Sequence, residues 1–169
     1  MLPYIAGFDQ IGYVTTDIAR AGKILGDFGI PDFHREVRTL SGVIRGQTGS
    51  VEISIALANV GGVQVELIQP VSGLTDFYTE LLPRNGDFGL AFHHVRVRVT
   101  GTLADWARTV SEIDTKTRPI ALDVREGDNL RVLYVDDRAH IGHYMEYVWQ
   151  SEAYAARRKS SVPRFEGSR

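Results

Sequence analysis

Alternating apolar and polar positions along the chain predict a protein built mainly of β-strands. The clearest run places Val51, Ile53, Ile55 and Leu57 at every second position, with polar or small residues between them. A period of two residues is typical of a strand that buries one face. Runs of apolar character predict strands at residues 8–14, 34–40, 50–59, 63–69, 91–99, 118–124, 130–136 and 143–149.

Capping residues place helices between some of these strands. Asp17, which follows two threonines, offers an N-cap for a helix over about residues 17–28, and Thr102 does the same for residues 102–113. Helical spacing of apolar residues also covers residues 72–82. The predicted order is therefore βαβββ, a connecting helix, and βαβββ again.

The two halves also resemble each other in sequence. Residues 8–14 (FDQIGYV) return as residues 92–98 (FHHVRVR), and residues 63–68 (VQVELI) return as residues 143–148 (HYMEYV). The order of elements and these echoes together indicate one module built twice. We therefore predict an α+β fold with two tandem βαβββ modules.

The repeat also sets the predicted domain boundaries. The first module, with its linker helix, covers residues 1–85, and the second covers residues 86–150. Residues 151–169 begin helically and become basic and rich in Pro, Gly and Ser. We expect this C-terminal tail to be mobile, because chain ends that are not tied down usually are.

A polar side chain interrupts an apolar strand at matching places in the two halves. Gln10 and Glu66 take these places in the first half, and His94 and Glu146 take them in the second. A buried polar group is costly unless something satisfies it. Four such groups at matching positions indicate one shared partner, and a divalent metal ion is the natural candidate. For His94 alone, the alternative is a histidine satisfied within the core.

Composition excludes other classes of function. The 169 residues carry a formal net charge of −2, whereas nucleic acid as main partner favours a strongly basic face. No apolar run approaches the ~20 residues of a membrane span, and the first residues lack the features of a secretory signal. Without cysteine there are no disulfides and no thiolate ligands. We expect a cytoplasmic protein that binds neither nucleic acid nor membranes.

Four segments carry a family resemblance: residues 9–12 (DQIG), 65–70 (VELIQP), 92–95 (FHHV) and 142–148 (GHYMEYV). In this order they resemble the vicinal oxygen chelate superfamily, which includes glyoxalase I, methylmalonyl-CoA epimerase, extradiol dioxygenases and bleomycin-resistance proteins. The first two are closest in pattern. The resemblance covers about residues 8–149. It implies that paired modules curl their mixed sheets into a cup-shaped site with a metal ion on its floor.

Under this resemblance the metal ligands fall on Gln10, Glu66, His94 and Glu146. Many similar proteins carry His in the first strand, where this chain has Gln10, and an amide oxygen is a neutral and weaker ligand. An oxygen-rich set with one imidazole suits Zn, Mn, Co, Ni, Fe or Mg. The missing first-strand His counts against an Fe(II) extradiol-type dioxygenase, which uses two His and one carboxylate.

Strand alternation predicts which other residues share the cup. Arg96 and Arg98 lie on the same face as His94, where they would suit a carboxylate, phosphate or coenzyme A-type substrate. Tyr144 would hydrogen-bond a carbonyl oxygen. The alternative is that both arginines pair with sheet carboxylates such as Glu52.

Two residues beside the candidates have simpler predicted roles. Gly12 would leave room for substrate, since it shares the face of the ligands. Neighbouring residues of a strand face opposite sides, so we expect His93 to point outward or to stand behind the ligands.

These features favour a divalent-metal-dependent isomerase, epimerase or lyase of the glyoxalase type that acts on a small carbonyl compound. Glu146 or Glu66 would take a proton next to a metal-bound carbonyl, and the metal with Tyr144 or an arginine would hold the enolate. The sequence leaves open which glutamate is the base. The alternatives are a non-catalytic small-molecule-binding protein of the resistance type, the iron dioxygenase and a purely structural module. Similar proteins are often dimers, so a homodimer is one possible assembly; alternatively, the two copies complete one cup within a single chain.

Overall fold

The computed structural model describes residues 5–30, 32–158 and 164–165. The strands span β1 (Ile5–Thr15), β2 (His34–Ile44), β3 (Gln47–Val60), β4 (Val63–Gly73), β5 (Leu90–Val99), β6 (Ile120–Glu126), β7 (Leu130–Asp136), β8 (Tyr144–Gln150) and β9 (Arg164–Phe165). The helices span α1 (Ile18–Asp27), α2 (Asp76–Thr79), α3 (Leu103–Ser111), α4 (Arg138–Ile141) and α5 (Glu152–Arg158).

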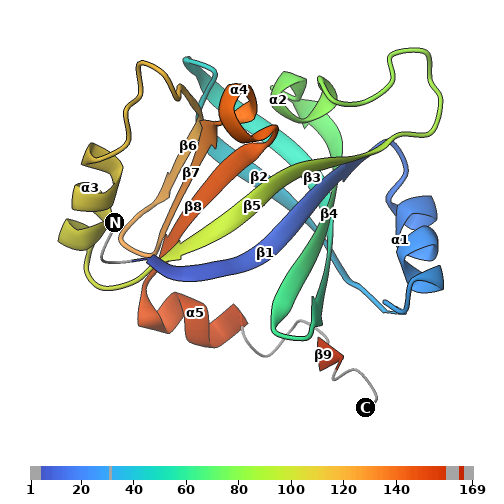
Figure 1. The fold of residues 1–169 in the computed structure, drawn as a ribbon, viewed down its shortest axis with the longest axis horizontal. Coiled ribbons are helices and arrows are strands. Elements are labelled where there is room, and N and C mark those ends of the chain that lie inside the picture. The colour runs from blue at the N-terminus through green and yellow to red at the C-terminus, as the bar shows by residue number, and fades with distance from the viewer. Residues whose placement is uncertain (1–4, 31, 159–163, 166–169) are drawn as a thin grey trace.

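Eight of these strands form one mixed, barrel-like sheet (Figure 1). Its order is β2-β6-β7-β8-β5-β1-β4-β3, and β2 also pairs with β3, so that the sheet returns to its first strand. The closure between β2 and β6 is short, from Gly42 opposite Val124 to Ile44 opposite Leu122. A side chain would not fit at this seam, because a Cβ added to Gly42 would lie 2.2 Å from the main-chain oxygen of Asp123.

Helices α1 and α3 pack on the outside of the sheet (Figure 1). Asp17 caps α1 as predicted, and Thr102 forms a capping box with Asp105 at the start of α3. Ala21 of α1 and Trp106 of α3 belong to two separate apolar clusters with residues of the strands beneath them. Each helix is thus held by one apolar face, as expected of a helix packed on a sheet.

The largest apolar cluster fills much of the barrel interior. Branched residues of β2, β3, β6 and β7 pack there with Phe77 and Tyr78, which come from α2 and are at most 1% exposed. Helices α2 and α4 lie at one end of the barrel, and α5 lies at the other (Figure 1). Burial of this apolar surface is the main force that stabilises such a fold.

The α+β class and the predicted strands are confirmed, with small shifts at their ends. The helix predicted at residues 72–82 is reduced to the four residues of α2, because β4 continues to Gly73. The sequence pattern did not predict α4 or β9. The duplication of one module and the domain boundaries stay predictions.

The predicted mobile tail contains two regular elements in its described part. Residues 152–158 form α5, in agreement with the expected helical start, and β9 pairs with the end of β3. The remainder of the tail, at residues 159–163 and 166–169, lies outside the described residues. The mobility of the tail therefore stays a prediction.

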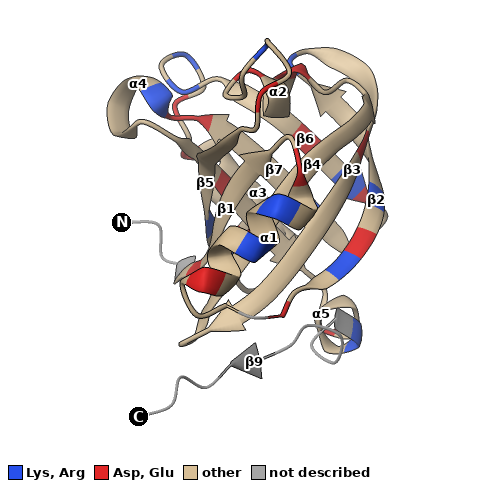
Figure 2. Cartoon of the chain, turned by 90° about the vertical axis from the view of Figure 1, so that its right-hand side faces the viewer, with Lys and Arg blue, Asp and Glu red and all other residues tan. Residues whose placement is uncertain are grey.

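Charges of both signs are mixed on the outer surface. Figure 2 shows basic and acidic residues together on α1 and on β2. Within the described residues, no helix combines the length and the apolar character that crossing a membrane requires.

Candidate functional site

The four candidate ligands lie on four adjacent strands, one on each: Glu66 on β4, Gln10 on β1, His94 on β5 and Glu146 on β8. Two neighbouring rows of paired residues hold them, namely Glu66–Gly12–His94–Tyr144 and Gln64–Gln10–Arg96–Glu146. Residues two apart on a strand share a face, so both rows point into the barrel. All four candidates are buried, with exposed fractions of 8% or less.

Gly12 allows these side chains to meet. It lies between His94 and Glu66 in its row and has no side chain to separate them. The imidazole of His94 lies over this position, because a Cβ added to Gly12 would stand 1.9 Å from Cε1 of His94. The space that we predicted for substrate at Gly12 is therefore taken by the ring of His94.

Nε2 of His94 is the centre of the group. It lies 3.4 Å from Oε2 of Glu66 and 3.4 Å from Oε2 of Glu146. The terminal amide of Gln10 is 3.3 Å away. The structure thus brings together all four residues that the sequence singled out, which we call the four-residue cluster. Their role as metal ligands stays a prediction.

The amide of Gln10 can meet its neighbours in two orientations. In one, its oxygen faces Nε2 of His94 at 3.3 Å and its nitrogen donates to Gln64 at 2.8 Å. In the other, its nitrogen donates to Oε2 of Glu146 at 3.0 Å and its oxygen accepts from Nη1 of Arg96 at 3.1 Å. The second orientation satisfies the carboxylate and the guanidinium together but turns the amide nitrogen toward Nε2 of His94, so it fits a His94 without a hydrogen on Nε2, whereas the first fits a His94 that carries one.

Burial and opposite charges act against each other in the four-residue cluster. Burial by itself lowers the pKa of His94, but hydrogen bonds to Glu146 and Glu66 outweigh burial and raise this pKa to about 9. Burial raises the pKa of Glu146, but His94, Arg96 and Tyr134 outweigh it and hold this pKa below its ordinary value. At neutral pH the metal-free protein therefore holds His94 as an imidazolium against carboxylates.

Two β-bulges turn further side chains toward the barrel. The register between β1 and β5 shifts so that Asp9 is an extra residue on β1 and His93 is an extra residue on β5. An extra residue interrupts the alternation of faces. His93 and His94 are consequently both 0% exposed, with their Nδ1 atoms 3.1 Å apart. The outward orientation considered for His93 is wrong, and His93 stands directly behind His94.

Asp9 binds both arginines that share the face of His94. Its Oδ1 accepts from Nε of Arg96 at 2.7 Å, and its Oδ2 accepts from Nε of Arg98 at 2.6 Å. Burial raises the pKa of Asp9, but Arg96 and Arg98 outweigh it and hold this pKa below its ordinary value. The arginines thus pair with a carboxylate, although with Asp9 and not with Glu52. Their predicted role in substrate binding stays a prediction.

The hydroxyl of Tyr144 joins a separate polar group near α2 and α4. It donates to Glu80 and accepts from Nη2 of Arg45 at 2.7 Å. Arg138 lies over the ring of Tyr144, 4.7 Å from its centre. The hydroxyl is therefore engaged by protein groups in this structure, and its contact with a substrate stays a prediction.

A protein-family model identifies the family of this chain. The model describes the Glyoxalase/Bleomycin resistance protein/Dioxygenase superfamily, and it matches residues 9–134. The chain belongs to this superfamily. No curated protein sequence matches the chain.

Solved structures of similar fold include several methylmalonyl-CoA epimerases. The Mycobacterium tuberculosis enzyme is 16% identical over 90% of this chain and 93% of its own, with a TM-score of 0.52. A Streptomyces coelicolor variant in complex with 2-nitronate-propionyl-CoA is 20% identical over 87% of this chain and 99% of its own, with a TM-score of 0.52. An epimerase in complex with methylmalonyl-CoA and NH4+ is 19% identical over 88% and 96%, with a TM-score of 0.52. At these identities the likeness shows the shared fold.

In this member of the superfamily, two tyrosines that the sequence did not predict as site residues lie near the four-residue cluster. Tyr134 of β7 pairs with Glu146 in the sheet and shares a hydrogen bond with it, and its ring centre lies 5.0 Å from that of His94. Strand alternation within β7 was the available signal, because a tyrosine on a buried face needs a hydrogen-bond partner. Tyr78 comes from α2; the sequence pattern predicts a helix there, but not that this side chain enters the largest apolar cluster.

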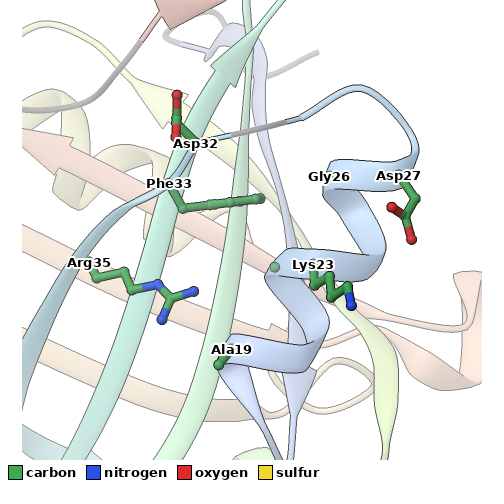
Figure 3. Close-up of a pocket in the computed structure, with 8 residues that line it drawn as sticks. Ala19, Lys23, Gly26, Asp27, Asp32, Phe33 and Arg35 are labelled. Carbon is green, nitrogen blue, oxygen red and sulfur yellow. The ribbon is translucent and has the colours of Figure 1, made fainter.

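The cavity drawn in Figure 3 lies elsewhere, on the outer surface between α1 and the start of β2. It measures ≈ 540 Å³, and Figure 3 shows Lys23 and Asp27 of α1 opposite Phe33 and Arg35. None of the four cluster residues lines it. This cavity is therefore separate from the candidate site inside the barrel.

Proposed function

We propose that the protein is a divalent-metal-dependent epimerase, isomerase or lyase of the glyoxalase type, which acts on a small anionic carbonyl compound. The observation that carries this proposal is the meeting of two carboxylates and an amide around one imidazole nitrogen at a buried position. Membership of the superfamily supports the same class of function.

The donor atoms of the four-residue cluster fit a divalent cation. Carboxylate, amide and imidazole groups are ligands of zinc and of the harder divalent ions. Ligands that share one ion at about 2.1 Å lie roughly 3.0–3.4 Å apart, and the donors here are 3.3–3.4 Å from Nε2 of His94. The hydroxyl of buried Tyr78 has no hydrogen-bond partner among the described residues. Such a group is costly, and a further group bound at the site would satisfy it.

The two glutamates differ in their suitability as a base. A divalent ion held by the cluster would polarise a substrate carbonyl and make the neighbouring C–H more acidic. His94, Arg96 and Tyr134 hold the pKa of Glu146 below its ordinary value in the metal-free protein, and Arg96 and Tyr134 would stay beside it with an ion bound, which makes Glu146 the poorer proton acceptor. We assign proton transfer to Glu66 and assign Glu146 to holding the ion.

The charges beside the four-residue cluster favour an anionic substrate. Arg96 and Arg98 share the carboxylate of Asp9, and Arg96 also interacts with Glu146 and Glu66. With a divalent ion bound and His94 neutral, the ion and the two arginines would carry four positive charges against these three carboxylates, which leaves one positive charge in excess. Arginine binds carboxylate and phosphate groups in a planar geometry. One similar structure holds methylmalonyl-CoA, which combines a carboxylate, a carbonyl and phosphates. We therefore choose methylmalonyl-CoA as the first compound to test.

One observation favours the competing function, a non-catalytic small-molecule-binding protein. Within the described part of the chain, no three His, Asp or Glu side chains are already placed so as to hold a metal ion. The cluster residues instead contact one another directly, with an oxygen of each carboxylate 3.4 Å from Nε2 of His94. Metal binding therefore requires that the Nε2 proton of His94 leaves.

Metal binding and proton exchange test the two functions separately. Chelator-treated protein titrated with Zn²⁺ should bind one ion per chain. In D₂O the loaded protein should then exchange the proton next to the thioester carbonyl of methylmalonyl-CoA, followed by NMR. Zn²⁺ binding without exchange favours the binding protein, and failure to bind any divalent ion overturns the metal proposal.

Substitution of the assigned base sharpens this test. Glu66→Gln should lose the exchange by about 100-fold or more, within the range expected of a general base. Glu52→Gln is the matched control, because Glu52 lies on β3 outside the cluster, and it should retain wild-type exchange. Full activity of Glu66→Gln would remove Glu66 from proton transfer.

A further inference from the structure

His93 makes polar contacts with both of its ring nitrogens. Its Nδ1 lies 3.1 Å from Nδ1 of His94, and its Nε2 lies 3.4 Å from the main-chain oxygen of Phe77 in α2. We propose that His93 is a positioning residue that fixes the imidazole of His94 with its hydrogen on Nδ1 and its Nε2 turned to the four-residue cluster. The functional meaning of this role rests on the proposed metal site.

Counting hydrogens assigns the direction of this chain of contacts. The carbonyl oxygen of Phe77 can only accept, so Nε2 of His93 must carry the hydrogen of that contact. A neutral imidazole has one N–H, so Nδ1 of His93 carries a lone pair. The hydrogen between the two Nδ1 atoms therefore belongs to His94. When Nε2 of His94 gives up its hydrogen to bind a cation, the hydrogen that remains is therefore the one on Nδ1, which His93 and the Phe77 carbonyl hold in place.

The surroundings of His93 keep it neutral. It is fully buried, and the rings of Phe77, Tyr78 and Tyr144 pack around it at centre distances of 4.8, 5.3 and 4.8 Å. Burial without a carboxylate in contact disfavours an imidazolium.

The direction of these hydrogen bonds bears on the four-residue cluster. With Nδ1 of His94 committed to His93, Nε2 is the nitrogen that can present a lone pair to a cation, and it faces Glu66 and Glu146. Groups that hydrogen-bond the far nitrogen of a metal-binding histidine fix its tautomer and orientation. Here this partner is itself a histidine, and the bulge in β5 is what places it inside the barrel.

Two substitutions separate a polar role from packing. His93→Phe keeps a ring in the aromatic cluster but removes the acceptor, whereas His93→Asn keeps an acceptor at about the place of Nδ1. Phe77→Leu is the control, because it disturbs the same aromatic cluster and keeps the main-chain carbonyl. Circular dichroism confirms that each variant folds.

Nitrogen-15 spectra of the metal-free protein at neutral pH test the hydrogen positions without any metal. We expect His93 to be neutral with its hydrogen on Nε2. A His93 that is protonated on Nδ1, or that is an imidazolium, overturns the proposal. This result is independent of whether the protein binds a cation.

Zn²⁺ competition titrations then test whether the contact of His93 with His94 strengthens metal binding. His93→Phe should weaken binding about 10- to 100-fold, as expected for the partner of a ligating histidine. His93→Asn and Phe77→Leu should stay within about threefold of wild type. Wild-type affinity in folded His93→Phe overturns the positioning role. If wild type itself binds no Zn²⁺, the proposed function fails, and the nitrogen-15 result still decides the hydrogen positions.

Discussion

Strands β1 and β5 each contain a β-bulge beside the site, but different side chains occupy the two bulges. Each carries a bulge residue directly before its cluster residue: Asp9 before Gln10 in β1, and His93 before His94 in β5. In β1 the bulge residue is a carboxylate that accepts from Arg96 on the neighbouring strand. In β5 it is an imidazole that contacts the cluster imidazole itself.

This difference shows how two similar strands divide the work of one site. Strand β1 supplies the neutral amide of Gln10 and the carboxylate of Asp9, which pairs with arginine. Strand β5 supplies the imidazole of His94 and the imidazole of His93, which contacts it. A bulge turns a neighbouring residue to the inner face in both strands, so the chemistry depends on which side chain occupies it. The following predictions test whether the two strands are truly different in role.

Exchanging the cluster residues between the strands should produce the largest effect. His94→Gln makes β5 resemble β1 and removes the imidazole, so Zn²⁺ affinity should fall by about 100-fold or more. Gln10→His makes β1 resemble β5, and a second imidazole should raise the affinity about tenfold. Competition with a chromophoric chelator measures both. Equal affinities for His94→Gln and wild type would contradict the assigned asymmetry.

Adding a side chain at Gly12 of β1 should produce the second largest effect. Gly12→Ala places a methyl group 1.9 Å from Cε1 of His94, whose ring is buried and cannot move freely. We expect a loss of about 2–3 kcal/mol in the free energy of unfolding, as for other overpacked sites, together with weaker Zn²⁺ binding. Urea unfolding measures the stability.

Gly26→Ala is the matched control for this substitution. Gly26 lies in α1, and a Cβ added there meets nothing within 4 Å. Alanine should be neutral or stabilise the helix by about 0.5–1 kcal/mol. A Gly12→Ala protein as stable as Gly26→Ala would show that the ring of His94 does not need the space over Gly12.

The sequence predicted the strands and the four-residue cluster because both follow a period of two. Glu66 and Glu146 stand among apolar neighbours, and this placement is visible without a structure. Alternation failed at His93, since a bulge inserts one residue that no local pattern announces. It also could not show that Asp9 would bind the arginines, because that contact crosses between strands 87 residues apart in sequence.

His94 in β5 titrates, whereas Gln10 in β1 does not. The dependence of stability on pH therefore distinguishes the two strands. The pKa of His94 rises from 6.5 to about 9 in the folded protein. The folded state then binds this proton more tightly, so the stabilisation is complete below pH 6.5 and is lost as the pH rises through 9. We expect the metal-free protein to lose on the order of 2 kcal/mol of unfolding free energy over this window.

Urea unfolding in the presence of chelator, at steps between pH 6.5 and 9, measures this loss. His94→Gln should show a nearly flat dependence over the same window, because glutamine does not titrate. Zn²⁺ affinity of the wild type should instead rise with pH, since the ion competes with the Nε2 proton. Parallel curves for wild type and His94→Gln would assign the pH dependence to another group.

The smallest effect should come from the bulge residue of β1. Asp9→Asn leaves Arg96, whose side chain is 12% exposed, without an anionic partner on β1, and we expect a loss of about 1 kcal/mol. Asp123→Asn is the control, because Asp123 pairs with Arg125, whose side chain is 69% exposed, and exposed pairs contribute less than about 0.5 kcal/mol. If urea unfolding gives the same loss for both, Asp9 behaves as a surface partner. The bulge in β1 would then have no buried charge to organise, and only the bulge in β5 would serve the site.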